Sequence, residues 1–261
     1  MTASCGQVIL LVTGKTVTNR KNDYYQETRM ATNTTETKKP LPAMERRQRI
    51  RQQTISSILD AARAIMREEG VPALNLNEVA RRVGMRPQSL AEYFPNKAAM
   101  YDTLFATAIR LMREGDDRAK AEHPPDWGRV RAWFENRLAF AEKYPELFHL
   151  TIDMPVPGFI PSEENRQAVS ELLESARRGI AEVAEAGAMD PGMPPDRAVD
   201  ILLTARHGII AEALGKGAAF PERSARFRRL IPDVIAVYQK AWTPQHMTRP
   251  TESGGEGEAG E

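Results

Sequence analysis

The amino-acid sequence predicts an all-α fold of about nine helices, arranged as a small N-terminal domain and a larger C-terminal one. Apolar residues recur at helical spacing, three and four apart, through almost all of residues 44–242. No segment alternates apolar and polar residues as a half-buried strand would. The stretch 74–97 in addition indicates two short helices joined by a glycine turn.

The first expected helix ends at Gly70, because glycine tolerates the left-handed conformation that closes a helix. Its buried face is marked by Ile55, Ile58, Leu59, Ala62, Ile65 and Met66. Asn77 is expected to cap a second helix that runs to about Val83. A third follows over about 87–93, opened by a proline that suits the first turn of a helix.

Proline, glycine and capping residues separate the later helices. Asn96 is expected to cap one whose inward residues are Tyr101, Leu104, Phe105, Ala108 and Met112. Ser162 caps another, whose expected buried stripe is Val169, Leu172, Leu173, Ala176, Ile180 and Val183. Further helices are expected over 127–143, from Pro145, over 196–214 and over 221–242, where Pro232 kinks or breaks the last.

Composition divides the chain into four parts. Residues 1–43 and 243–261 are expected to be disordered, because they lack helical periodicity and are rich in polar residues or in Gly and Glu. Residues 44–95 form the first expected domain and residues 96–242 the second. Met30 and Met44 are alternatives to Met1 as the start of translation.

The stretch 74–97 has the layout of a helix-turn-helix. Ala80 is small enough for the two helices to cross closely, and Gly84, four residues later, accepts the positive φ of the turn. Leu90, together with Val79 and Val83, closes the small core. The alternative is an ordinary helical hairpin with a glycine turn, so the surface residues have to decide between the two.

The second helix of this motif carries side chains suited to a DNA major groove. Gln88 can pair with adenine and Ala91 can contact a thymine methyl group. The expected DNA-binding residues are Asn77, Arg86, Pro87, Gln88, Ser89, Ala91, Tyr93 and Lys97. Ser, Tyr and Lys in this set have the donors of phosphate contacts. Glu92 argues mildly against DNA binding, because a carboxylate faces phosphates poorly unless it accepts from cytosine.

Positive charge is concentrated around this motif. Residues 45–97 hold ten basic and six acidic side chains, whereas the whole chain has a net charge of +1. A basic segment gains affinity for DNA by displacing counterions from the phosphates. The charge alone is a weak indication, since charged runs are mostly solvated faces.

The composition argues against several other classes of function. Cys5 is the single cysteine, so no intrachain disulfide can form and the reducing cytoplasm is the expected location. No apolar run approaches the roughly 20 residues of a membrane helix. The four histidines are scattered, none at the spacing of a metal site, so no metal, cofactor or catalytic activity is expected.

The second domain carries the candidate ligand pocket, which is expected to be mostly apolar. Its candidate residues are Trp133, Arg137, Phe140, Phe148, Phe159, Arg206 and His207. Arg206 and His207 lie in the middle of an apolar helix, where a charge is costly without a partner. That partner can be a ligand, an internal ion pair, or an interface carboxylate such as Asp200 or Glu212. The aromatic residues can equally be plain core.

The helix expected over 196–214 is apolar nearly all round, which suits a helix buried on two sides. One side can face its own domain and the other a second copy of the chain, although the central helix of a monomeric bundle has the same pattern. A two-fold dimer presents its recognition helices to major grooves about 34–36 Å apart, or a multiple, and requires a near-palindromic operator.

Several motifs together resemble the TetR-type (tetracycline-repressor-like) transcriptional regulators over residues 50–112. They are the apolar first helix ending in Glu69-Gly70, Leu76-x-x-Val79-Ala80, Gly84, Ser89-Leu90, and Tyr93-Phe94-Pro95-Asn96-Lys97. Three further motifs extend a weaker resemblance to about residue 242: 144–148, 155–159 and His207-Gly208.

The resemblance implies a homodimer that binds double-stranded DNA, pairs through the helices over 196–214 and 221–242, and responds to a small-molecule effector. It further implies a repressor that the effector releases from its operator by spreading the two recognition helices. Tyr93 and Lys97 would contact phosphates. Ala91 departs from the pattern, because the family often has tyrosine at that position. The alternative is a protein of this fold that binds a ligand or partner and little DNA.

Overall fold

The computed structural model describes residues 42–215 and 221–244. The disorder expected for residues 1–43 and 243–261 falls almost wholly outside these ranges. By compactness the chain divides into two units, Met1–Arg49 and Ile50–Glu261. The described part of the first unit is residues 42–49, in which the Arg46 N–H donates to the Pro42 carbonyl at 3.0 Å and residues 44–49 are exposed.

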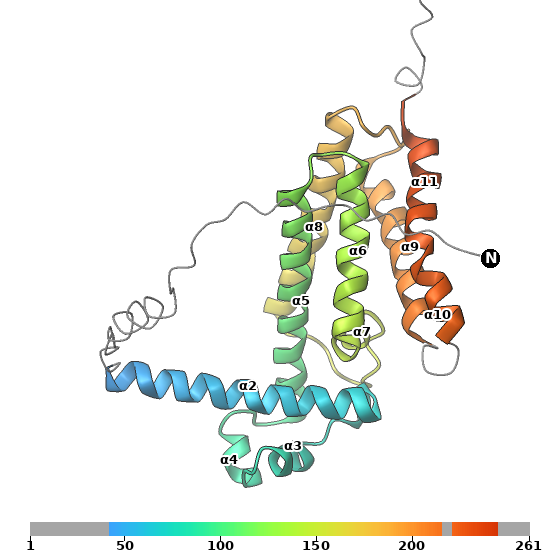
Figure 1. Ribbon diagram of the computed structural model, residues 1–261. Helices are drawn as coiled ribbons and strands as arrows, with labels where there is room; N and C mark the ends of the chain where they lie inside the picture. Colours follow the sequence, from blue (N-terminus) through green and yellow to red (C-terminus); the bar gives the residue numbers. More distant parts are fainter. Residues whose placement is uncertain (1–41, 216–220, 245–261) are drawn as a thin grey trace, which may run out of the picture. The chain divides into compact units, whose positions relative to one another are not determined.

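Every regular element in the described ranges is a helix, as the sequence predicts (Figure 1). In chain order they are α2 (Ala43–Glu69), a single 3₁₀ turn (Val71–Ala73), α3 (Leu76–Arg82), α4 (Pro87–Ala91), α5 (Lys97–Glu122), α6 (Trp127–Lys143), α7 (Pro145–Ile152), α8 (Glu163–Glu185), α9 (Pro195–Gly215), α10 (Pro221–Arg228) and α11 (Leu230–Trp242). None of these helices is both long and apolar enough to cross a membrane.

Polar side chains begin several of the helices. Asn96 and Ser162 cap α5 and α8 as expected, since their side-chain oxygens accept backbone N–H groups at 2.8 and 3.3 Å. For α3 the prediction was wrong. Asn75, not Asn77, is the cap, and its Oδ1 accepts from the Asn77 N–H at 2.9 Å. A cap has an extended backbone before the first turn, and Asn75 has it (φ −134°, ψ 121°), whereas Asn77 already lies inside the helix.

Two details of the second half also differ from prediction. The last expected helix is divided at Arg229 into α10 and α11, not at Pro232. Pro232 lies in the first turn of α11, where the N–H that proline lacks would have no helical partner. Leu173 was expected in the buried stripe of α8 but is 36% exposed, because it lies about 100° around the helix from Leu172, which packs inward.

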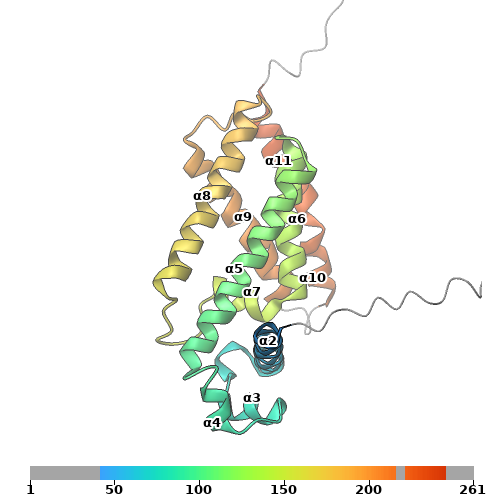
Figure 2. The same cartoon turned by 90° about the vertical axis from the view of Figure 1, so that its left-hand side faces the viewer.

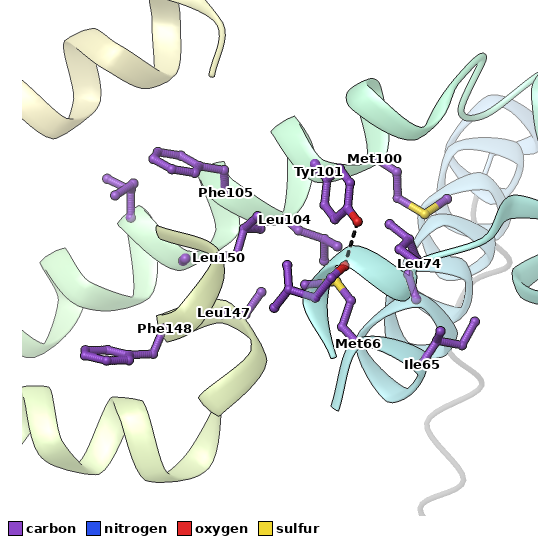
Figure 3. Close-up of a cluster of buried hydrophobic side chains, with 14 of the residues drawn as sticks. Ile65, Met66, Leu74, Met100, Tyr101, Leu104, Phe105, Leu147, Phe148 and Leu150 are labelled. Atoms are coloured by element: carbon purple, nitrogen blue, oxygen red, sulfur yellow. Dashed lines mark hydrogen bonds between the residues drawn. The ribbon is translucent and has the colours of Figure 1, made fainter. Parts of the chain in front are cut away.

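One hydrophobic core joins the helix-turn-helix to the helices behind it (Figure 3). It contains Ile65 and Met66 of α2, Leu74 of the following loop, Leu104 of α5, and Leu147 and Leu150 of α7. The Tyr101 hydroxyl donates to the Val71 carbonyl at 2.6 Å, which fixes the segment before α3 to α5. Burial raises the pKa of Tyr101 to about 12, so the hydroxyl remains a donor at physiological pH.

A second core lies among α6, α8, α9 and α11 and includes Phe134, Val183, Leu202 and Ile235. Helix α5 contributes to both cores, with Leu104 in the first and Ala119 in the second. It packs against α6, α7 and α8, and both views show it beside α6 (Figures 1 and 2). Because α5 begins directly after the helix-turn-helix, it connects that motif with the interior of the C-terminal helices.

Candidate functional sites

The helix-turn-helix consists of α3, a short turn and α4. Gly84 in the turn has φ +68°, a left-handed conformation that glycine adopts at little cost. The Met85 N–H closes the turn by donating to the Ala80 carbonyl at 2.9 Å. Val79, Ala80 and Leu90 are each at most 1% exposed. The small core on which the motif was recognised is therefore present.

Helix α4 presents a polar face to its surroundings. Arg86, Gln88 and Ala91 are exposed, as is Pro87 at the start of the helix, whereas Ser89 is half-buried. An exposed carboxamide such as that of Gln88 can donate and accept in one plane, as the major-groove edge of adenine requires. Glu92 is exposed on the same segment, so the unfavourable carboxylate also reaches solvent.

Three expected DNA-binding residues lie beside α4. Tyr93 is half-buried, and the Arg51 guanidinium lies 4.9 Å from the centre of its ring. Lys97 Nζ donates to the Pro72 carbonyl at 2.7 Å, which leaves two ammonium hydrogens for a phosphate. Asn77 is exposed in the first turn of α3. Sequence reasoning missed Arg51, because its contact with Tyr93 joins two segments far apart in the chain.

Ion pairs within this domain consume part of its positive charge. Glu78 accepts from Arg81 and Arg82 at 2.7 and 2.9 Å, and Arg82 also pairs with Glu68 at 2.7 Å. The bonds from Arg81 and Arg82 lower the pKa of Glu78 to about 2, so this carboxylate stays ionised. Arg81 and Arg82 therefore offer less charge to DNA than a count of basic residues suggests.

A buried carboxylate joins α2 to α7. Glu146 is 2% exposed, and it accepts from Arg63 Nε at 2.8 Å and from Arg67 Nε and Nη2 at 3.0 Å. The Arg63 guanidinium also lies 4.8 Å from the ring centre of Tyr144. This site could not be predicted from the sequence, because a Glu directly after Pro145 looks like an ordinary acidic residue of a first helical turn.

Two buried arginines lie between α6 and α9. Arg137 is 3% exposed, and its Nη2 donates to Asp116 of α5 at 3.1 Å. Arg206 is 2% exposed, and its guanidinium carbon lies 3.8 Å from the ring centre of Trp133. Within the described residues, the Nε and Nη1 atoms of Arg206 are buried and have no hydrogen-bond partner. Asp116 was not foreseen as a member of this group.

This group carries an excess of positive charge. Burial lowers the pKa of Arg206 well below its ordinary value; the charge of Arg137 adds to this effect, and Asp116 opposes it. A guanidinium nevertheless keeps its proton in proteins. Burial and the charges of Arg206 and Arg137 lower the pKa of His207 to about 4, so His207 is neutral at physiological pH. We call these residues (Asp116, Trp133, Arg137, Arg206 and His207) the arginine cluster.

A cavity of about 50 Å³ adjoins the arginine cluster. Its walls come from α5, α6 and α8 and include Asp116, Val130, Trp133, Ala176 and Ile180. Of the seven candidate ligand residues, Trp133, Arg137, Arg206 and His207 come together in the arginine cluster, and Trp133 is the one of these four that lines the cavity. The other three, Phe140, Phe148 and Phe159, pack in the first core with α5 and α7. The structure thus divides the predicted pocket into two regions.

Residues 58–104 match a family model described as bacterial regulatory proteins, tetR family. The chain is also 24% identical, over 115 residues, to the nucleoid occlusion factor SlmA of Vibrio cholerae serotype O1. That match covers 44% of this chain and 58% of the relative, so it spans less than two thirds of that protein.

Solved structures share the fold over most of the chain. A protein of unknown function from Rhodococcus sp. RHA1 has a TM-score of 0.62 at 20% identity, covering 73% of this chain and 96% of its own. The transcriptional regulator FadR from Bacillus subtilis, solved in complex with stearoyl-CoA, has a TM-score of 0.56 at 13% identity, covering 72% and 98%. The fold therefore extends well beyond the segment that the family model matches.

Proposed function

We propose that this chain, whose residues 58–104 match the tetR family of bacterial regulatory proteins, is a sequence-specific, DNA-binding transcriptional regulator. In this proposal it represses transcription as a homodimer on a near-palindromic operator. A small-molecule effector bound among the C-terminal helices favours a spread arrangement of the two DNA-binding domains and releases the operator. The protein would act in the cytoplasm, on the chromosome.

The polar face of α4 is the observation that carries the proposal. Gln88 is assigned to a base edge and Arg86 to guanine or a phosphate. Half-buried Ser89, Tyr93 and Lys97 are assigned to phosphates, which set the register on DNA. The proposed contact residues are Asn77, Arg86, Pro87, Gln88, Ser89, Ala91, Tyr93 and Lys97, to which the geometry adds Arg51.

The proposed dimer uses α9 together with α10 and α11. The outward side of α9 carries Thr204, Gly208 and Ala211, which are exposed and small enough for a second helix to approach closely. Val237 on α11 is 67% exposed, although it is a large apolar residue. An exposed apolar residue and a row of small exposed residues, on two helices that contact each other, support pairing with a second copy.

Two exposed residues of the α4 segment favour a second candidate function. Ala91 provides no ring or donor for DNA, and Glu92 places a carboxylate where phosphates would lie. A protein of this fold that binds a ligand or another protein, and little DNA, would have such a surface. Salt dependence separates the two candidates, because a DNA-binding protein loses affinity steeply as salt rises.

The test begins with selection of binding sequences from random duplexes by the purified full chain. Enrichment of a near-palindrome is the expected result, and its affinity is then measured by fluorescence anisotropy at several salt concentrations. Equal, weak binding to the enriched and to a scrambled duplex would favour the second candidate.

The variant Gln88→Ala tests whether Gln88 contacts a base edge. It should reduce discrimination at one base pair by about 1–3 kcal/mol and leave the slope against salt unchanged, since no phosphate contact is removed. The matched control is Gln167→Ala on α8, an exposed position outside the proposed interfaces, which should bind like wild type. A Gln88→Ala variant with unchanged preference at every position would show that α4 does not read the sequence through Gln88.

A further inference from the structure

Arg206 has hydrogen-bonding capacity that the described fold does not use. The residue is 2% exposed, and its Nε and Nη1 atoms have no hydrogen-bond partner in residues 42–215 and 221–244. A buried polar group without a partner costs free energy, and a charged group costs more. A hydrogen-bond acceptor on a bound ligand would offset this cost, so the unpaired donor atoms of Arg206 indicate a ligand site.

The charge balance of the arginine cluster indicates the charge of that ligand. Arg137 and Arg206 are cations, Asp116 is the carboxylate that pairs with Arg137, and His207 is neutral. One positive charge is therefore left over, and it belongs to Arg206. A monovalent anion neutralises it, whereas a divalent anion would leave a negative charge beside Asp116. A planar carboxylate also matches the flat fork of a guanidinium.

The surroundings of the cluster indicate the rest of the ligand. Trp133 carries the Arg206 guanidinium on its ring and also forms part of the wall of the 50 Å³ cavity. Val130, Ala176 and Ile180 make part of the wall apolar, and the charged residues Asp116, Asp117, Lys120 and Arg129 line the rest of it. Since one water needs about 10–15 Å³ of such volume, the cavity has room for a small apolar group. Arg206 is not itself a lining residue of this cavity, so a ligand that fills the cavity and reaches the guanidinium requires the Trp133 ring between them to move.

We propose that Arg206 binds the carboxylate of a small monocarboxylic acid whose apolar body occupies the cavity beside Trp133. That this acid is the effector of the regulator rests on the proposed function. The acid site itself does not depend on DNA binding.

A carboxylate of a second subunit is the other source of a partner for Arg206, and burial argues against it. A group on another chain reaches exposed atoms, whereas Arg206 is 2% exposed and its guanidinium lies against the ring of Trp133 on α6. A small acid can reach the cluster through the cavity, whose rim contains the exposed residues Asp117 and Lys120.

The test measures thermal stability and calorimetric binding of the full chain with pairs of compounds that differ only in charge. Benzoate is compared with benzamide, and the straight-chain acids from acetate to decanoate are compared with their primary amides, all at one ionic strength. At least one acid should raise Tm more than its amide does, because ligands that bind only the native state stabilise it. Binding should also change tryptophan fluorescence, since Trp133 must move.

Three variants locate the site. Arg206→Met keeps the length of the side chain and removes its charge, and it should weaken the acid by roughly ten- to a hundredfold. Arg206→Lys keeps the charge but not the fork and should weaken the acid less. Arg131→Met, which removes an exposed arginine from α6, is the matched control and should bind like wild type. Circular dichroism checks that each variant is folded.

Two further outcomes separate the proposed acid site from the proposed regulatory function. If no acid stabilises the wild type more than its amide, or if Arg206→Met binds the acid as tightly as wild type, the acid site is wrong. Selective DNA binding in that same preparation would leave the regulator standing. If acid binding depends on Arg206 but the protein does not bind DNA selectively, the acid site is supported and the proposed function as a DNA-binding regulator is wrong.

Discussion

Glu146 and Arg206 are both 2% exposed, but their surroundings differ in kind. Glu146 accepts three hydrogen bonds from two arginines, and those arginines keep contact with solvent, with side-chain exposures of 21% for Arg63 and 49% for Arg67. Arg206 has two buried donor atoms without a partner among the described residues, and its cationic neighbour Arg137 is as buried as it is.

The charge of Glu146 is used to hold the fold together, whereas the charge of Arg206 is available for a ligand. Water screens the excess charge of the two arginines at Glu146, so that site is complete and ties α2 to α7. No comparable screening reaches Arg206. A cation in apolar surroundings is retained at the expense of stability, which is typical of binding sites. Opposite effects on stability are therefore expected when the two charges are removed.

The largest expected effect is at Glu146. Glu146→Gln keeps the size of the side chain but turns one acceptor into an NH₂ donor that faces guanidinium N–H groups. Breaking a buried ion pair from one side costs about 3 kcal/mol or more. We expect the free energy of unfolding, measured with urea at one protein concentration, to fall by about 3 kcal/mol.

The matched control for this variant is Glu142→Gln. Glu142 pairs with Arg228 at 2.7 Å, but both side chains are about 40% exposed (39% and 45%). Exposed pairs contribute at most about 1 kcal/mol, so this variant should unfold nearly like wild type. Equal losses at Glu142 and Glu146 would mean that burial does not distinguish the two ion pairs.

A smaller effect of opposite sign is expected at Arg206. Arg206→Met leaves the neutral pair of Arg137 and Asp116 and removes the unpaired cation, at the loss of its contact with Trp133. Apolar replacement of buried charge is commonly neutral or stabilising, and an interaction with an aromatic ring offsets about 1 kcal/mol. Stability without ligand should stay level or rise by up to about 2 kcal/mol. A loss as large as that of Glu146→Gln would show that Arg206 supports the fold.

The helix-turn-helix could be predicted because its signals are local. Ala80, Gly84 and Leu90 lie within eleven residues of one another, and each has a role set by backbone geometry or by burial in the turn. The same holds for Asn96 and Ser162 as caps. Asn75 and Asn77 were confused because both can cap, and only the observed start of α3 decides between them.

The buried charges could be predicted only in part, because their partners are distant in the chain. Arg206 stood out as a charge in an apolar helix, and Trp133 and Arg137 of the same candidate set do lie beside it, but nothing local indicated Asp116 as a further neighbour. Glu146 gave no signal, since its two arginines lie on α2. Phe140, Phe148 and Phe159 were grouped with Arg206 by composition, and the fold places them in the other core.

The smallest expected effect on stability comes from the titration of His207. Its pKa also reports most directly on the charge of the arginine cluster. Its pKa is about 4 in the folded protein and about 6.5 in an unfolded chain, so between these values the unfolded chain binds a proton that the native state does not. The contribution of His207 to the free energy of unfolding should therefore fall as the pH is lowered from about 6.5 to about 4, and stay constant above that range. Because His207 is partly exposed, its share should be only about 1 kcal/mol.

The measurement is an NMR titration of the histidine ring protons, with His207 assigned by its absence in His207→Asn. Burial and the cations Arg206 and Arg137 hold the His207 pKa down, so Arg206→Met should raise it, and so should an acid bound at Arg206. Glu146→Gln should leave it unchanged. A His207 that titrates near 6.5 in the wild type would mean that the positive charge at the cluster is already neutralised, and the contrast with Glu146 would then disappear.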